Sequence, residues 1–157
     1  MRRTEQLLAR LAIEELNAEF AYLIDHEQSE RVADLFTVDG SYGRSTGERS
    51  VGRDAIRRAY ASRKAKGPRT ARHIFTNLRL KFEARDRATG TCIMTLFAED
   101  GVPPHVAEPF LVADYNDVYV LFEDNWRYSA RTITWLFMRR DGKVSPLPLG
   151  VDEEAPR

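Results

Sequence analysis

The stretch "RTARHIFTNLRLKF", residues 69–82, decides the prediction of the fold because its apolar positions change parity part-way along. They first share the odd parity of His73 and then turn even, at Leu78, Leu80 and Phe82. Successive side chains of a regular strand point to opposite faces, so one parity should hold along the whole strand. The sequence therefore predicts a strand over 70–85 with a bulge or sharp bend near Thr76–Asn77.

Three later segments are also typical of strands, since they are rich in β-branched and aromatic residues and are separated by turn-forming residues. They cover 88–99, 108–123 and 125–140. Four long strands that follow one another with short connections favour a mostly antiparallel sheet.

The first part of the chain is predicted to be mainly helical. Apolar residues at three- and four-residue spacing mark a first helix over 4–26, with Thr4 as its N-cap. Ser29 is expected to cap a short second helix over 30–36, and a third helix covers 54–66. Helices first and strands afterwards indicate an α+β fold in which helices pack on one face of a bent sheet.

Connecting segments are assigned by their composition. A turn is predicted at 38–40 and a loop at 44–52. No linker divides residues 1–140, which are predicted to form a single domain. The proline-containing segment 141–157 is predicted to be an extended or disordered C-terminal tail.

Composition and charge exclude several classes of function. The 24 Lys and Arg residues offset the 24 Asp and Glu residues, so no nucleic-acid surface built on net charge is expected. The basic run 53–69 is interpreted as the solvated face of a helix. Cys92 is alone, which rules out an intramolecular disulfide, and its apolar surroundings in the sequence indicate a buried, inert thiol.

The sequence predicts a cytoplasmic protein without membrane association. No apolar run approaches the roughly 20 residues that a membrane-spanning helix needs. The first 20 residues are amphipathic and contain acids, so they do not have the pattern of a signal peptide. Three scattered histidines show no metal-ligand spacing, and no cofactor is expected.

A sheet that curls around a long helix encloses a pocket, and such pockets are mostly apolar with a few convergent polar groups. Asp25, His73 and Arg131 are polar residues at positions where the pattern points inward. Each also has a purely structural interpretation: an exposed acid at a frayed helix end, a structural strand histidine, and a structural ion pair. Together they fit a histidine base that a carboxylate orients, with a cation that stabilises developing negative charge.

The chain resembles the SnoaL-like branch of the nuclear-transport-factor-2-like superfamily over about residues 4 to 140. The resemblance rests on the segments "LLARLAIEELNAEFAYLIDHEQSERVADLFTVDGSY", "GRDAIRRAY", "RHIFTNLRLKF" and "NWRYSARTITW". It implies a cone-shaped barrel of three N-terminal helices packed on a strongly curved, mostly antiparallel mixed sheet that encloses a pocket. It also implies a homodimer or homotrimer.

Within this branch the resemblance assigns roles to residues. Asp25 and His73 match the Asp–His pair of scytalone dehydratase, hexachlorocyclohexane dehydrochlorinase and bile-acid 7α-dehydratase. Arg131 matches an arginine of the latter two enzymes, and Tyr42 resembles a tyrosine that polarises the substrate of scytalone dehydratase. Phe20 stands where the dehydrochlorinase has a catalytic lysine, so dehalogenation is not expected.

Further departures concern the second histidine and the tyrosine of scytalone dehydratase. Ile24 replaces that tyrosine, and His105 is a loose candidate for the histidine. The residues expected to contact a substrate are Tyr22, Phe20, Phe75 and Trp135.

These expectations combine into a cofactor-independent, dehydratase-like lyase. It would use the Asp25–His73 dyad to abstract a proton from a small cyclic or polyketide-like, hydrophobic substrate. Two alternatives remain: an isomerase or polyketide cyclase that uses the same base, and a non-catalytic domain that binds a small ligand.

Overall fold

The structure is a computed structural model that describes residues 1–140, 144 and 146–150. These residues contain three helices and six strands, in the order α1 (Arg3–Asp25), the 3₁₀ helix η1 (Ser29–Leu35), β1 (Phe36–Arg44), β2 (Arg49–Val51), α2 (Arg53–Lys64), β3 (Arg69–Phe82), β4 (Arg87–Asp100), β5 (Leu111–Phe122) and β6 (Asn125–Met138).

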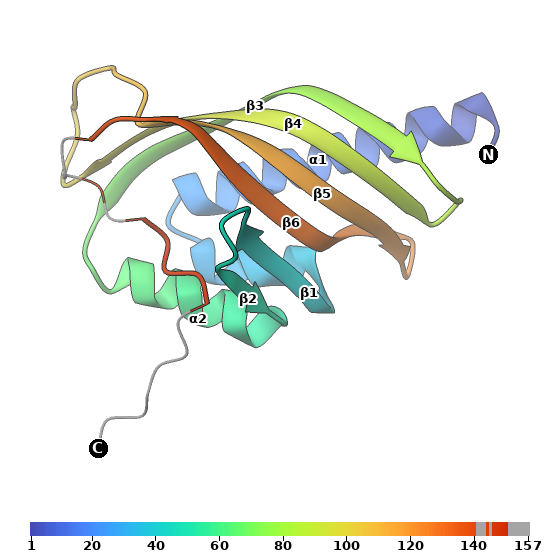
Figure 1. Cartoon of the computed structure of the whole chain (residues 1–157), viewed down its shortest axis with the longest axis horizontal. Coiled ribbons are helices and arrows are strands. Elements are labelled where there is room, and N and C mark those ends of the chain that lie inside the picture. Colours follow the sequence, from blue (N-terminus) through green and yellow to red (C-terminus); the bar gives the residue numbers. More distant parts are fainter. Residues whose placement is uncertain (141–143, 145, 151–157) are drawn as a thin grey trace.

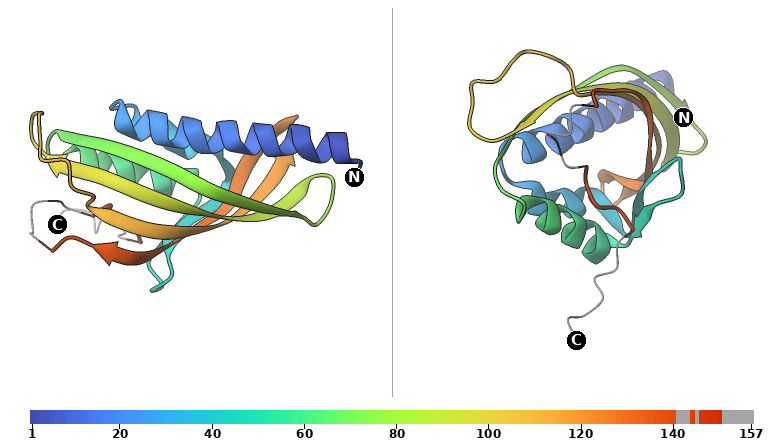
Figure 2. Two further views of the ribbon diagram at one scale, coloured as in Figure 1. Left: turned by 90° about the horizontal axis from the view of Figure 1, so that it is seen from above. Right: turned by 60° about the vertical axis from the view of Figure 1, so that its left-hand side comes forward.

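The six strands form one mixed sheet in the order β2-β1-β6-β5-β4-β3. All neighbours are antiparallel except β1 and β6, which run parallel. The sheet curves around the helices, and α1 runs along its inner face (Figures 1 and 2). The edge strands β2 and β3 do not pair, so the predicted cone is a strongly curved open sheet rather than a closed barrel.

Strand β3 bends where its sequence predicts a bend. Its register with β4 shifts between Thr76 and Arg79, and Asn77 has a φ of 55°. Asparagine tolerates this left-handed conformation better than most residues. Before the bulge the odd-numbered side chains of β3 point inward. After it the even-numbered side chains do, and Leu78, Leu80 and Phe82 pack on the core. The predicted bulge is confirmed.

Helix α1 begins one residue earlier than predicted. Arg2 is its N-cap, and the Glu5 carboxylate accepts the backbone N–H of Arg2 at 2.8 Å. Thr4 is therefore not the cap but lies in the first turn. The buried stripe of α1 faces the sheet and contains Ile13, Leu16, Phe20 and Leu23.

Two strands of the sheet were missed in the sequence. The turn predicted at 38–40 lies inside β1, and the loop predicted at 44–52 contains β2. Asp and Gly are rare in strands, and β1 contains both, at Asp39 and Gly40. The pairing of β1 with β6 is interrupted at this point, between Phe36 and Ser41, and this irregularity accommodates them.

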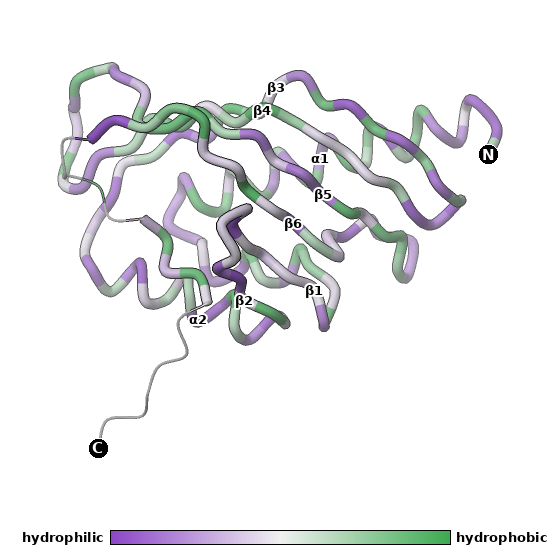
Figure 3. Tube along the Cα trace, in the orientation of Figure 1, coloured by the Kyte–Doolittle hydropathy of each residue, from purple (hydrophilic) through white to green (hydrophobic). Residues whose placement is uncertain are grey.

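Hydrophobic and hydrophilic segments alternate along the long strands (Figure 3), and the inward half of the pattern forms one core with the helices. Cys92 belongs to this core, and burial raises the pKa of its thiol to about 11. The prediction of a buried thiol is confirmed. In the part of the chain that the structure describes, no helix is long and apolar enough to cross a membrane.

Part of the C-terminal segment packs against the domain. Val144 and Leu149 are buried, and the Gly150 backbone N–H donates to Ser50 Oγ at 3.3 Å. The prediction for 141–157 otherwise falls on residues 141–143, 145 and 151–157, which lie outside the described residues.

Candidate functional site

A cavity of about 390 Å³ lies between the end of α1, helix α2 and the inner face of the sheet. Most of its wall is apolar, and five strands and the C-terminal segment contribute to it. The apolar lining includes Ile24, Met94, Leu96, Phe110, Ile133 and Leu149. This is the environment expected of a small-molecule pocket.

Asp25 and His73 meet at the wall of this cavity. Asp25 is the last residue of α1, and His73 lies before the bulge of β3. Asp25 Oδ1 lies 2.6 Å from His73 Nδ1, and Asp25 Oδ2 accepts the backbone N–H of His73 at 2.8 Å. The predicted contact between the two side chains is therefore present in the structure.

The contact assigns the proton of the imidazole. A carboxylate accepts hydrogen bonds, so Nδ1 carries the proton that points to Asp25 and the neutral ring keeps its lone pair on Nε2. No described residue hydrogen-bonds Nε2, and His73 lines the cavity whereas Asp25 does not. The arrangement presents a basic nitrogen to the cavity.

Three tyrosines line the same cavity: Tyr42, Tyr60 and Tyr115. The hydroxyls of Tyr42 and Tyr115 are 2.7 Å apart, so one donates to the other. Burial raises the pKa of both phenols, which keeps them protonated and able to donate. Of the three, sequence reasoning found Tyr42 only; strand parity could have found Tyr115, which shares the buried odd positions of β5.

Arg131 lies behind this wall and not in the cavity lining. It is fully buried, and its Nε and Nη2 each donate to Asp117 at 2.9 Å. Nη2 also donates to Asn17 Oδ1 at 2.5 Å. The predicted place of Arg131 beside the substrate is therefore corrected: the guanidinium is held in a buried ion pair with the residue opposite it on β5.

Aromatic rings separate Arg131 from the cavity. Its guanidinium carbon lies 4.3 Å from the ring centre of Phe20 and 4.2 Å from that of Tyr115. Phe20 and Phe75 pack edge-on against each other, with ring centres 6.1 Å apart, and neither lines the cavity. These two predicted substrate contacts instead support the cavity wall from behind.

The other predicted contacts divide between cavity and surface. Trp135 lines the cavity, and the Arg44 guanidinium lies 4.6 Å from its ring centre. Tyr22 is half exposed and stacks on His26, with ring centres 4.1 Å apart. It lies outside the lining because two residues along a helix turn a side chain through about 200°, away from the buried Phe20.

His105 lies on the loop between β4 and β5 and outside the cavity lining, where its Nε2 is 3.3 Å from Thr70 Oγ1. Among the described residues, His, Cys, Asp and Glu side chains do not gather in a group of three or more that could hold a metal ion.

The model of the SnoaL-like domain matches residues 5–132. No curated protein matches the chain significantly. Solved structures share its fold at low identity. A putative scytalone dehydratase from Novosphingobium aromaticivorans has 20% identity and a TM-score of 0.78, over 97% of this chain and 100% of that one.

Two further structures are similar. LinA has 20% identity and a TM-score of 0.75, over 93% of this chain and 99% of its own. A protein of unknown function with a cystatin-like fold from Nostoc punctiforme has 23% identity and a TM-score of 0.69, over 82% and 91%. The family model covers most of the chain and the neighbours share its architecture, so this protein belongs to the SnoaL-like domain family, within the nuclear-transport-factor-2-like, cystatin-like fold.

Proposed function

We propose that this protein is a dehydratase-like lyase that needs no cofactor and acts on a small cyclic or polyketide-like hydroxylated compound. The observation that carries the proposal is the Asp25–His73 pair, which turns the free nitrogen of the imidazole toward a largely apolar cavity. A putative scytalone dehydratase among the structural neighbours supports a lyase-type role.

Each group has a role in an elimination through an enolate. Nε2 of His73 removes a proton from the carbon next to a carbonyl, and the electron pair of that C–H bond moves onto the carbonyl oxygen. Asp25 stabilises the imidazolium that forms. As the C=C bond closes, the C–O bond to the hydroxyl breaks, and the imidazolium returns its proton to the leaving oxygen. The products are an unsaturated carbonyl compound and water.

The tyrosine pair replaces Arg131 as the group that stabilises the oxyanion. Tyr42 and Tyr115 lie in the cavity lining with hydroxyls that hydrogen-bond each other, and a donor that is itself a hydrogen-bond acceptor is polarised. Arg131 contributes its charge from behind, through the face of the Tyr115 ring. Preorganised donors of this kind stabilise charge that develops in the transition state.

An isomerase or a polyketide cyclase would begin with the same proton abstraction. The first experiment therefore tests that shared step. The protein is incubated in D₂O with β-hydroxy ketones of one and two rings, and mass spectrometry follows deuterium uptake at the α-carbon and loss of water. We expect uptake with at least one of these compounds, and loss of water if the enzyme is a dehydratase.

His73→Ala is the decisive variant, and Tyr22→Phe is its control because that ring lies on the surface. Exchange should disappear in His73→Ala and persist in Tyr22→Phe. A ligand that binds equally to wild type and His73→Ala and is changed by neither would instead establish a non-catalytic binding domain. The predicted homodimer or homotrimer stays a prediction, which light scattering can check.

A further inference from the structure

The charged side chains in the cavity lining are unevenly distributed. Four are cationic and one is acidic: Arg44, Arg63, Lys64, Arg69 and Glu27. The cations come from the end of α2, the start of β3 and the end of β1. A catalytic site for wholly neutral compounds has no need of this excess, because the proposed reaction uses an imidazole and two phenols.

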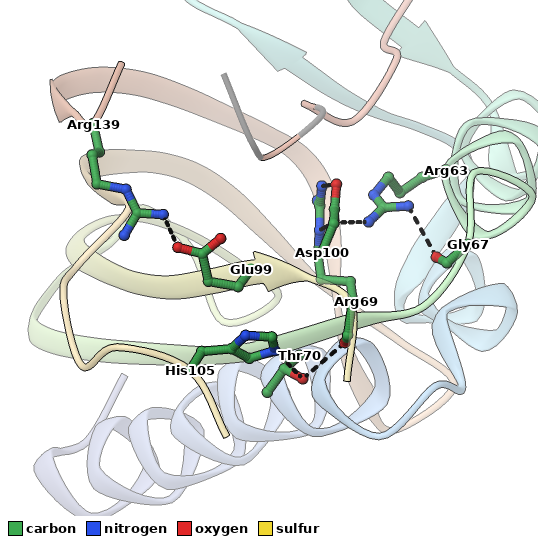
Figure 4. Close-up of polar contacts among 9 residues, drawn as sticks. Arg63, Gly67, Arg69, Thr70, Glu99, Asp100, His105 and Arg139 are labelled. Atoms are coloured by element: carbon green, nitrogen blue, oxygen red, sulfur yellow. Dashed lines mark hydrogen bonds and ion pairs between the residues drawn. The ribbon is translucent and has the colours of Figure 1, made fainter. Parts of the chain in front are cut away.

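Arg63 is the most buried of these cations, with 8% of its surface exposed. Figure 4 shows its contacts with Asp100 and Gly67. Its Nη2 donates to Asp100 Oδ1 at 2.5 Å, and its Nη1 donates to the Gly67 carbonyl at 3.4 Å. Its Nε is buried and has no hydrogen-bond partner among the described residues. A buried donor without an acceptor destabilises the folded protein, so this N–H is a candidate ligand contact.

A second guanidinium shares the carboxylate that holds Arg63. Arg69 Nε donates to Asp100 Oδ1 at 2.6 Å, so the same oxygen accepts from both arginines. Asp100 is not in the cavity lining, whereas both arginines are. The carboxylate therefore holds both guanidinium groups at the cavity wall.

The charges favour an additional anion at the corner of the cavity that Arg63 and Arg69 form. Burial and the neighbouring charge of Arg69 lower the pKa of Arg63, which means that its surroundings disfavour the charged guanidinium. Lys64 is held in the same manner, since its Nζ lies 3.3 Å from Glu30, a residue outside the lining. An anionic group in the cavity would offset the repulsion between the cations.

We propose that the cavity takes a ligand with an apolar ring body and a carboxylate, and that Arg63 binds this carboxylate at the corner formed with Arg69. The ring body then lies against the apolar lining. A guanidinium suits this role because its planar N–H groups match the two oxygens of a carboxylate. The inference rests on the proposed function in one respect, namely that the acid is the substrate on which His73 acts.

The test compares two probes of nearly the same shape, 2-naphthoate and its uncharged amide, 2-naphthamide. Binding is measured on the full chain by calorimetry at neutral pH. We expect the wild type to bind naphthoate about tenfold more tightly than naphthamide, as one charge-assisted contact provides. Added salt should weaken the binding of naphthoate only. Equal affinities for the two probes would overturn the proposal.

Two substitutions locate the contact. Arg63→Gln should bind naphthoate and naphthamide with nearly equal affinity, whereas Arg57→Gln should keep the preference of the wild type for naphthoate. Arg57 is a matched control because it lies on the same helix, is exposed and pairs with Asp34 and Asp54 outside the cavity. If Arg63→Gln does not fold, Arg63→Lys keeps the charge but lacks the Nε–H, and it should reduce the preference for naphthoate. An unchanged preference in a folded Arg63 variant would contradict the assignment.

His73→Ala separates this inference from the proposed reaction. The variant should lose proton exchange and keep its preference for naphthoate. Loss of the preference would show that the anion binds at the imidazole and would overturn the Arg63 site. Conversely, a wild type that prefers naphthoate but exchanges no proton would uphold the anion site and reject the lyase.

Discussion

Both carboxylate oxygens of Asp25 bind one residue, His73: Oδ1 accepts from the ring at 2.6 Å and Oδ2 accepts from the backbone N–H at 2.8 Å. The second hydrogen bond ties the carboxylate to the backbone of β3. The orientation of the imidazole is therefore set by the strand that carries it, and the end of α1 is joined to that strand at the same point.

Replacing Asp25 by Asn should impair the reaction more than the fold. The amide oxygen can still accept the backbone N–H of His73, but the amide N–H₂ then faces Nδ1 and moves the ring proton to Nε2. We expect the rate of proton exchange to fall by about 10²- to 10⁴-fold, the range that general base catalysis provides. Exchange in D₂O and urea unfolding measure the two effects. A rate within twofold of the wild type would contradict the orienting role of Asp25.

Removing the hydroxyl of Tyr115 should slow the reaction without unfolding the protein. Tyr115→Phe keeps the ring that covers Arg131 and deprives Tyr42 of its hydrogen-bond partner. We expect the rate to fall about tenfold, which corresponds to the typical net strength of one hydrogen bond. Tyr22→Phe removes a hydroxyl from the surface and should leave the rate unchanged. Equal rates in both variants would exclude the phenol pair from the mechanism.

Replacing only one partner of the buried ion pair between Arg131 and Asp117 should strongly destabilise the folded protein. Arg131→Met leaves a fully buried carboxylate without its cation, and such changes cost about 3–5 kcal/mol. Replacing both residues, as Arg131→Met with Asp117→Leu, should restore part of this stability. Urea unfolding of the two single variants and the double variant measures the coupling. If the double variant loses more stability than the two single variants lose together, this account is contradicted.

Stability should fall at alkaline pH, in part because of Cys92. Burial raises the pKa of its thiol from 9.0 to about 11, so the folded protein holds this proton more tightly than the unfolded chain does. The contribution is fully present below pH 9 and is lost as the pH rises to about 11. Cys92→Ala removes the titration and should make the decline shallower in this window. Urea unfolding measures the free energy of unfolding at each pH. If it declines equally in the wild type and in Cys92→Ala, the raised pKa of the thiol is contradicted.

The wild type should release no chloride from chlorinated cyclohexanes. The resemblance to the dehydrochlorinase puts Phe20 at the position of that enzyme's catalytic lysine, and here the ring lies outside the cavity lining and packs on the Arg131 guanidinium at 4.3 Å. Phe20→Lys would place a second cation against Arg131 and should destabilise the protein. Chloride release by the wild type well above that of His73→Ala would reject the preference for hydroxyl leaving groups.

Much of the architecture could be predicted from local patterns. The bulge of β3 follows from the parity of apolar residues, and α1 follows from helical spacing. The meeting of Asp25 and His73 is different, because 48 residues separate them in sequence. The inward-facing pattern suggested that the two residues act together, and the family resemblance matched them to a known pair. No periodicity by itself places the end of a helix beside a particular strand residue.

What was missed depends on register and context. Strand β1 contains Asp39 and Gly40, which favour turns, and tertiary pairing overrides that preference. Arg131 lies directly opposite Asp117, but the register of this hairpin shifts once between the turn and the pair, so counting residues back from the turn would not align the two. Tyr22, by contrast, could have been placed correctly, because its helical angle to the buried Phe20 points it away from the core.

The bulge at Asn77 divides β3 into two stretches with different neighbours. Ahead of it, Ala71 and His73 line the cavity; beyond it, the Leu78 carbonyl accepts from Arg10 in the first half of α1 at 3.2 Å. For enzyme engineering, residues of β3 before the bulge can therefore be substituted independently of those after it. New side chains at Ala71 would alter what the cavity accepts, while the packing under the start of α1 stays as it is.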